Sequence, residues 1–146
     1  MEKSITVFCD GGARGNPGPA ASGFAVVEGD NIIYKESKYL GETTNNVAEY
    51  KAVIMALDWL HKEKFSAGKI VFNLDSQLIT KQLMGEFKIK SERLKPLVTI
   101  AKDLEKKIDQ RIEYVWNPRS QNEIADTLVN DELDKHHKKN FTLQDT

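Results

Sequence analysis

Hydrophobic and polar positions in the first forty residues follow the pattern of β-strands. Apolar and β-branched residues are concentrated in the segments 4–9, 22–27 and 32–40. The residues Glu, Gly, Asp and Asn at 28–31 suit a tight turn between the second and third segments. The pattern predicts three strands in an antiparallel meander.

From Asn46 to Lys64 the period changes to that of a helix. This stretch contains neither Gly nor Pro, and Glu49, Val53 and Leu60 fall on one helical stripe. The pattern therefore predicts a helix that carries a carboxylate on its buried-facing side, within its first turns.

A fourth strand is predicted at 69–74, after Gly68. A strand reached through a helix normally runs parallel to a neighbour already in the sheet, because the crossover returns the chain to the same edge. Beyond this strand we expect a short helix at 76–84, an irregular basic connection at 85–95 and a second helix at 96–107.

The fifth strand is predicted at 111–116, and the Asn, Pro and Arg residues that follow it break the pattern. Ser120 and Glu123 have the spacing of a capping box and predict the start of a last helix. The order is β-β-β-α-β-α-α-β-α. We therefore expect an α/β fold, with a five-stranded mixed sheet and helices on both faces.

Length and composition favour a single domain over residues 1–146. With 21 Lys and Arg against 22 Asp and Glu, the chain lacks a global positive field, so nucleic-acid binding would depend on local patches. The lone Cys9 excludes an internal disulfide and fits a reducing compartment. No apolar run approaches the roughly 18 residues that span a bilayer. We expect a cytoplasmic monomer without membrane association, and a polar, frayed tail from about residue 138.

Four carboxylates have comparable positions relative to these elements. Asp10 and Asp75 each end a predicted strand, while Glu49 and Asp126 lie in the first turns of helices. Chemistry in open α/β sheets gathers at the carboxyl ends of strands, so we expect the four acids to meet there. Oxygen ligands without His or Cys favour Mg²⁺, and two such ions about 3.5–4 Å apart would support in-line phosphodiester displacement.

Each acid taken singly also has a structural explanation. Asp10 suits a turn, Asp75 a helix cap, and Asp126 the positive end of a helix dipole, while Glu49 follows the possible cap Asn46 by three residues. The glycine-rich loop predicted at 11–18, after Asp10, fits neither the G-x-G-x-x-G pattern nor a Walker A motif, which argues against nucleotide binding. Two tryptophans, Trp59 and Trp116, are expected in the core rather than as base-stacking platforms.

Four segments together resemble those of type 1 ribonucleases H in order and spacing: DGGARGNPGP at 10–19, TTNNVAE at 43–49, DSQ at 75–77 and NEIAD at 122–126. The resemblance implies a ribonuclease H-like fold over about residues 4–134. It further implies that two Mg²⁺ or Mn²⁺ ions are bound by Asp10, Glu49, Asp75 and Asp126. The implied activity is sequence-independent hydrolysis of the RNA strand of RNA/DNA hybrids, leaving 5′-phosphate ends.

Further site residues follow from the same resemblance. Contacts to the DNA strand or its phosphates are implied for Asn16, Thr44, Asn45 and Asn46. Contacts to ribose 2′-hydroxyls are implied for Gly11, Gly12, Ser76 and Gln77, and the 2′-hydroxyl is what distinguishes RNA from DNA. Where bacterial members commonly carry a histidine, this chain has Arg119, which is similar to archaeal-type relatives. An arginine is no general base at neutral pH, but it holds a phosphate well.

The basic region of the chain is short. Some family members have a long basic helical protrusion, whereas this chain offers a reduced patch with Phe87, Lys88 and Lys90 as candidate substrate contacts. This departure keeps open a catalytically weak or silent nucleic-acid-binding module of the same fold. A related nuclease acting on DNA is a third possibility, and the sequence does not decide whether double-stranded RNA is also a substrate.

Overall fold

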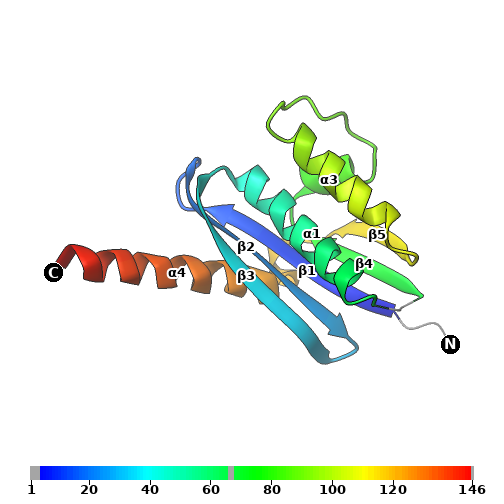
Figure 1. The fold of residues 1–146 in the computed structure, drawn as a ribbon, viewed down its shortest axis with the longest axis horizontal. Helices are drawn as coiled ribbons and strands as arrows, with labels where there is room; N and C mark the ends of the chain where they lie inside the picture. The colour runs from blue at the N-terminus through cyan, green and yellow to red at the C-terminus, as the bar shows by residue number, and fades with distance from the viewer. Residues whose placement is uncertain (1–3, 66–67, 146) are drawn as a thin grey trace.

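The computed structural model of the chain describes the backbone of residues 4–65 and 68–145, and side chains up to residue 137. Its elements follow the predicted order (Figure 1). They are β1 (Ser4–Ala13), β2 (Gly18–Glu28), β3 (Asn31–Thr43), α1 (Asn45–Lys62), β4 (Lys69–Leu74), α2 (Gln77–Leu83), α3 (Lys95–Lys106), β5 (Arg111–Trp116), the 3₁₀ turn η1 (Arg119–Gln121) and α4 (Glu123–Asp145).

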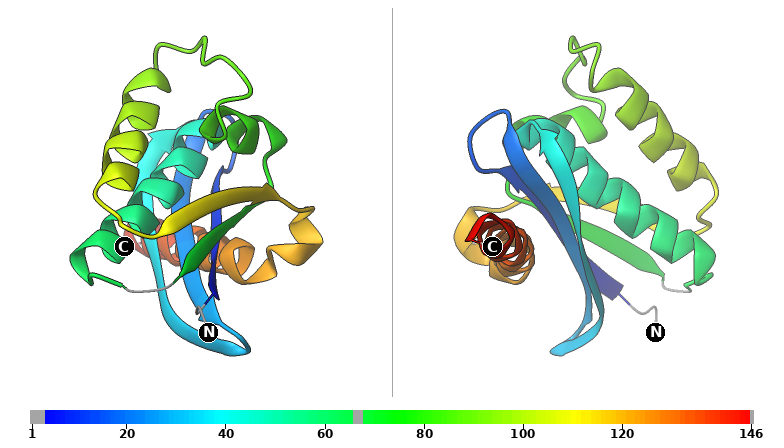
Figure 2. Two further views of the ribbon diagram at one scale, coloured as in Figure 1. Left: turned by 90° about the vertical axis from the view of Figure 1, so that its right-hand side faces the viewer. Right: turned by 60° about the vertical axis from the view of Figure 1, so that its left-hand side comes forward.

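The five strands form one mixed sheet in the order β3-β2-β1-β4-β5. The first three strands pair antiparallel through short connections, while β4 and β5 follow helices and pair parallel. Figure 2 shows α1 and α3 on one face of the sheet and α4 on the other. The predicted α/β fold, with helices on both faces, is confirmed.

Most of the core lies between the sheet and α1. Tyr50 and Leu57 of α1 are completely buried against Phe24 of β2 and Phe72 of β4. The helix begins at Asn45, one residue before the predicted start, because the Thr44 side chain accepts a hydrogen bond from the Val47 amide (3.3 Å) and caps it. The predicted apolar stripe is the buried face, so α1 holds Glu49 against the sheet.

The first strand is longer than the sequence predicts. We expected it to end on Asp10, because glycines follow; instead β1 continues to Ala13, which pairs with Ala20 of β2. Its parallel pairing with β4 stops earlier, at Phe8 opposite Asn73. Asp10 therefore lies just past the end of the parallel ladder while still fixed in the antiparallel one, which sequence periodicity does not show.

The start and the end of α4 also differ from the prediction. Ser120 lies in the 3₁₀ turn, and the helix begins at Glu123 after the buried residue Asn122, so the predicted capping box does not define its start. The helix then continues to Asp145 through the stretch predicted as a frayed tail, which contains neither Gly nor Pro. In Figure 1 its last turns extend beyond the sheet. Among the described residues, no helix has the length and apolar character needed to cross a membrane.

The two tryptophans have different environments. Trp59 packs against the core and stacks on Tyr34, with 4.6 Å between the ring centroids. Trp116 is 42% exposed, so the prediction of a core position is wrong for this residue. It ends the edge strand β5, and its indole N–H donates to the backbone carbonyl of Asp75 (3.2 Å). An edge position leaves one side of the ring without a covering strand.

Candidate active site

Three acids meet where the parallel pairing of β1 and β4 ends. Carboxylate oxygens of Asp10, Glu49 and Asp75 lie within 4.8 Å of one another. Two of these positions follow from strand register, because Phe8 pairs with Asn73 in parallel and each acid lies two residues further on. The three acids line a cleft at the surface, and Asp126, in the first turn of α4, lines it as well. The structure therefore brings together the four acids that the sequence singles out.

Glu49 reaches this cleft because α1 lies very close to β1. A Cβ atom at Gly11 would overlap the backbone carbonyl of Ala48, so only glycine permits this approach. Ser22, the partner of Gly11 on β2, donates its hydroxyl hydrogen to the same carbonyl (2.6 Å). The strand pair thus fixes the helix one residue before Glu49.

Burial makes the ionised form of the central acids costly. Asp10 is only 3% exposed and Glu49 only 6%. Burial, together with the charges of Asp75 and Asp126, raises the pKa of Asp10 from 3.8 to about 7, while Arg119 acts in the opposite direction. Burial and the neighbouring Asp10 and Asp75 also raise the pKa of Glu49 well above its ordinary value. The cleft therefore needs a positive charge to hold all its carboxylates ionised.

The donor set fits a hard divalent cation. Within the described part of the chain, Asp10 Oδ1 and Glu49 Oε2 are buried and have no hydrogen-bond donor. A buried carboxylate oxygen without a donor is costly, and a cation removes that cost. Carboxylates alone, without His or Cys, are the ligands that Mg²⁺ prefers. Asp10, Glu49, Asp75 and Asp126 are therefore the residues that would hold metal.

Arg119 lies beside the acids at the start of η1. Its Nε is 3.6 Å from Asp75 Oδ2, and its side chain is 72% exposed while that of Asp75 is 4% exposed. The guanidinium group thus has a buried anion on one side and solvent on the other. This placement suits a group that contacts a phosphate entering the cleft.

Several of the predicted substrate contacts also hold the end of β1 and the turn after it against α1. The side-chain oxygen of Asn45 accepts a hydrogen bond from the Ala13 amide (2.7 Å), and that of Asn16 accepts one from the Asn45 amide (3.0 Å). Thr44 is occupied as the helix cap. An amide that accepts through its oxygen keeps its NH₂ group as a donor, so the two asparagines can fix the loop and also bind a substrate.

The remaining predicted contacts fall into two groups. The cleft itself is lined by Gly11, Gly12, Asn46 and Ser76, and Ser76 also caps α2 through the Ile79 amide (3.3 Å). Gln77 is exposed at the first position of α2.

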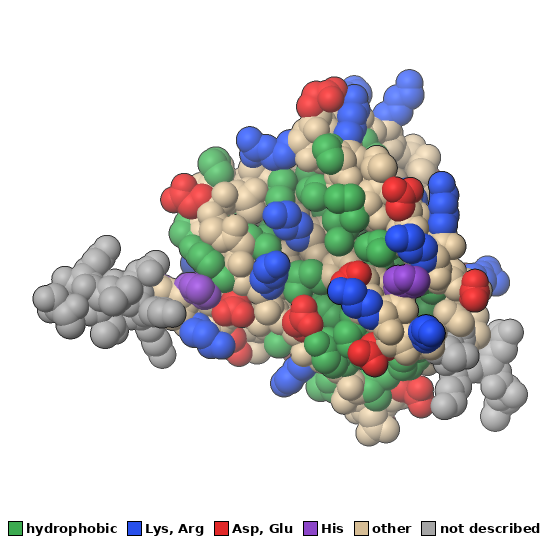
Figure 3. Space-filling view, viewed as in Figure 1, with side chains coloured by type: hydrophobic (Ala, Val, Ile, Leu, Met, Phe, Trp, Pro, Cys, Tyr) green, Lys and Arg blue, Asp and Glu red, His purple; other side chains and the backbone are tan. Residues whose placement is uncertain are grey.

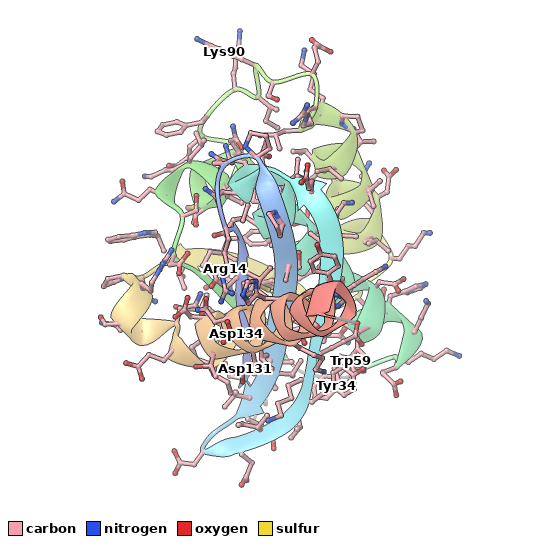
Figure 4. All side chains as sticks on the ribbon, turned by 90° about the vertical axis from the view of Figure 1, so that its left-hand side faces the viewer. Arg14, Tyr34, Trp59, Lys90, Asp131 and Asp134 are labelled. Atoms are coloured by element: carbon pink, nitrogen blue, oxygen red, sulfur yellow. The ribbon has the colours of Figure 1, made fainter. Side chains whose placement is uncertain are left out.

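The three basic-region residues lie away from the acids. An adjoining groove of about 520 Å³ is lined by Phe87, Lys88 and Lys90, and it shares Asn46 with the cleft. Lys90 lies at the tip of the loop in Figure 4, far from Arg14. On the face drawn in Figure 3, Lys and Arg are interspersed with Asp and Glu, in keeping with the near-neutral net charge.

The sequence did not single out two residues that also line the cleft, Arg14 and Asn130. Arg14, in the glycine loop, forms an ion pair with Asp134 of α4 (2.6 Å), as Figure 4 shows. Its position between Gly12 and Gly15, in the segment 10–19, was the available signal. The pairing with a residue 120 positions away is visible only in the fold.

Comparison with known proteins places the chain in a family. A family model described as reverse transcriptase-like matches residues 8–132. A ribonuclease HI of the archaeon Halobacterium salinarum is 39% identical over 132 residues, which make up 89% of this chain and 64% of that protein. The chain belongs to the type 1 ribonuclease H family. The resemblance seen in the sequence motifs is confirmed.

A solved type 1 ribonuclease H has the same fold. The crystal structure of LC11-RNase H1 in complex with an RNA/DNA hybrid superposes with a TM-score of 0.85 at 38% identity, covering 90% of this chain and 98% of that chain. A bifunctional protein of Mycobacterium tuberculosis is 38% identical over 132 residues. These residues are 89% of this chain but 35% of the mycobacterial protein, so the chain spans about a third of that relative's length.

Proposed function

We propose that this ribonuclease H domain is an endonuclease that hydrolyses the RNA strand of RNA/DNA hybrids without sequence specificity. The observation that carries the proposal is the four-carboxylate cleft, in which buried oxygens of Asp10 and Glu49 lack donors among the described residues. Membership of the family and the hybrid-bound relative support the substrate class. A cytoplasmic location and a monomeric state stay predictions.

The four acids would hold two divalent cations, Mg²⁺ or Mn²⁺. When bound, such ions activate a water molecule and stabilise the leaving oxygen of an in-line displacement, which gives 5′-phosphate and 3′-hydroxyl ends. Asp10 and Glu49 hold the buried side of the site, and Asp75 and Asp126 complete it. The exposed guanidinium group of Arg119 binds a phosphate of the substrate at the cleft mouth.

Substrate recognition requires no base contacts in this proposal. Backbone groups of Gly11 and Gly12, with the side chains of Ser76 and Gln77, bind 2′-hydroxyls of the RNA strand. The DNA strand lies along Asn16, Thr44, Asn45 and Asn46 and reaches the groove with Phe87, Lys88 and Lys90. Contacts of this kind read the shape of the hybrid rather than its sequence.

Cleavage of an end-labelled RNA/DNA hybrid tests the proposal directly. The wild-type protein is assayed with Mg²⁺, with Mn²⁺ and with chelator, beside the Asp10→Asn variant and with duplex DNA and double-stranded RNA as further substrates. We expect metal-dependent RNA cleavage in the hybrid that the variant loses. Hybrid binding without cleavage under either metal would instead identify a silent binding module, and cleavage of duplex DNA would identify a DNA-directed nuclease.

A further inference from the structure

Three asparagine side chains form a hydrogen-bonded chain that reaches the acids of the cleft. Asn117, after β5, donates to the side-chain oxygen of Asn73, near the end of β4. Asn73 donates to the side-chain oxygen of Asn122 (3.3 Å) and to the backbone carbonyl of Gln121 (3.2 Å). Asn122 in turn donates to the backbone carbonyl of Cys9 (2.8 Å). The chain of amides thus joins β1, β4, the loop after β5 and the start of α4.

The backbone carbonyl of Cys9 sets the direction of this chain. A carbonyl group only accepts, so the amide nitrogen of Asn122 faces it and the Asn122 oxygen faces Asn73. The same reasoning turns the nitrogen of Asn73 towards Asn122 and its oxygen towards Asn117. Asn122 is completely buried and Asn73 is 3% exposed, so water does not compete for these partners. Each amide is therefore held in one orientation.

One end of the chain reaches three of the acids. Its last acceptor, the Cys9 carbonyl, belongs to the residue before Asp10. The side-chain nitrogen of Asn122 also lies 3.5 Å from Asp75 Oδ2. The backbone carbonyl of Asn122 accepts a hydrogen bond from the backbone amide of Asp126 (3.0 Å). A shift of Asn122 would therefore move the acids of β1, β4 and α4 relative to one another.

The other end of the chain holds the turn that carries Arg119. Asn73 bonds to the carbonyl of Gln121, the last residue of η1, and Asn117 lies two residues before Arg119. The turn is thereby tied to β4, the strand that immediately precedes Asp75. Asn73 is the residue that bonds in both directions: to Asn122 on the side of the acids, and to Gln121 and Asn117 on the side of the turn.

We infer that Asn73 is a positioning residue for phosphodiester hydrolysis, an inference that rests on the proposed function. Its amide fixes the distance between Asp75, the first turn of α4 and the Arg119 turn. Asn73 touches no reacting atom and acts through Asn122 and the turn. Removal of a group that orients metal ligands in this way typically lowers metal affinity or activity by about tenfold to a hundredfold.

The test compares Asn73→Leu with the wild-type protein. Leucine has the same number of side-chain heavy atoms and the same branch point, but it neither donates nor accepts a hydrogen bond. We measure Mg²⁺ and Mn²⁺ binding by calorimetry without substrate, and kcat and KM on the hybrid at saturating metal. We expect weaker metal binding and a lower kcat, each by about tenfold, with KM changed by less than about twofold. Metal binding is read without turnover, so the inference stays testable even if the wild-type protein cleaves no hybrid.

Tyr114→Phe provides the matched control. Tyr114 lies on β5, and its buried hydroxyl donates to Glu105 (2.5 Å), outside the cleft. This variant loses one hydrogen bond of similar burial and should keep wild-type metal affinity and kcat. A folded Asn73→Leu protein with wild-type metal affinity and kcat would overturn the inference, as would equal losses in the control.

A second variant covers the case in which Asn73→Leu does not fold. Asn117→Leu removes the donor at the outer end of the chain, where the residue is half-buried. We expect losses of metal affinity and kcat in the same direction but smaller. In a double-mutant cycle, Asn117→Leu and Arg119→Ala should be non-additive, because both act through the same turn. Additive effects, or wild-type values for Asn117→Leu, would overturn the inference.

Discussion

At the scale of single residues, Asp10 is the acid on which the others converge. It is buried and lies two residues past the last parallel pair of β1 and β4. Burial and the charges of Asp75 and Asp126 raise its pKa. Ionised Asp10 therefore repels its neighbours until a cation is bound. In the proposed site the same residue would be a metal ligand, while its charge destabilises the metal-free fold.

The Asp10→Asn variant separates these two contributions. Removing the charge should lower hybrid cleavage by at least about a hundredfold, on the scale of losing one transition-state-stabilising group. The variant should also melt at the same temperature as the metal-free wild-type protein or higher, because repulsion is removed. A cleavage assay and a thermal melt check the two effects, and unimpaired cleavage would contradict the role of Asp10 as a ligand.

Arg119→Ala tests the phosphate-binding role at the same scale. We expect hybrid cleavage to fall roughly tenfold to a hundredfold, as for loss of a hydrogen bond to a charged group, while metal binding persists. Arg111→Ala is the control, since Arg111 pairs with Glu113 on the surface of β5 (3.0 Å) away from the cleft. Equal rates for the two variants would make Arg119 merely structural.

At the scale of elements, the site depends on how closely α1 lies against β1. Gly11 leaves room for the Ala48 carbonyl, and the Ser22 hydroxyl binds that carbonyl from the next strand. Glu49 is the next residue along the helix. The position of this cleft acid is therefore set by the contact between two elements and not by its own rotamer alone.

Gly11→Ala should force α1 away from the strand. Overpacking of this kind typically costs about 1–3 kcal/mol of unfolding free energy, and we expect cleavage to fall as well. Gly12→Ala is the matched control for stability, because its nearest neighbour would be Asn45 Oδ1 at 3.9 Å. Denaturant unfolding of both variants checks the prediction, which fails if the two are equally stable.

At the scale of the whole molecule, the cleft couples folding to pH and metal. The folded-state pKa of Asp10 is about 7, above its ordinary value of 3.8. Its protonation therefore adds stability that is fully present below about pH 4 and is lost as the pH rises through about 7. The raised pKa of Glu49 acts in the same direction. A divalent cation that binds the folded state, as proposed, should restore the stability that ionisation removes.

The pH dependence can be measured against a variant without this titration. In chelator, the melting temperature of Asp10→Asn should exceed that of the wild-type protein by a margin that grows from pH 5 to pH 8, because only the wild-type protein ionises Asp10 over this range. Other groups titrate in both proteins, so their effects cancel in the margin. Mg²⁺ at pH 8 should reduce the margin by stabilising the wild-type protein. A margin that does not change with pH would show that the pKa of Asp10 is not raised.

By itself, the sequence determined the order of the elements and the four acids. Local periodicity and turn residues encode where a strand or helix runs, and the boundaries predicted for those elements carry Asp10, Glu49, Asp75 and Asp126. Parallel register then brings Asp10 and Asp75 to the same edge of the sheet. The order of the elements depends on near neighbours in the chain, so a pattern of residue types is enough to predict it. That the four acids form one site was implied by the resemblance of four segments to type 1 ribonucleases H.

Only the tertiary structure decided the features that depend on distant partners. Pairing with β2 carries β1 past Asp10, the edge position of β5 exposes Trp116, and α4 supplies Asp134 to Arg14. The amide chain through Asn73 has the same origin, because its partners come from separate elements. Burial and hydrogen-bond partners are properties of packed surfaces, and residues far apart in the sequence create those surfaces together.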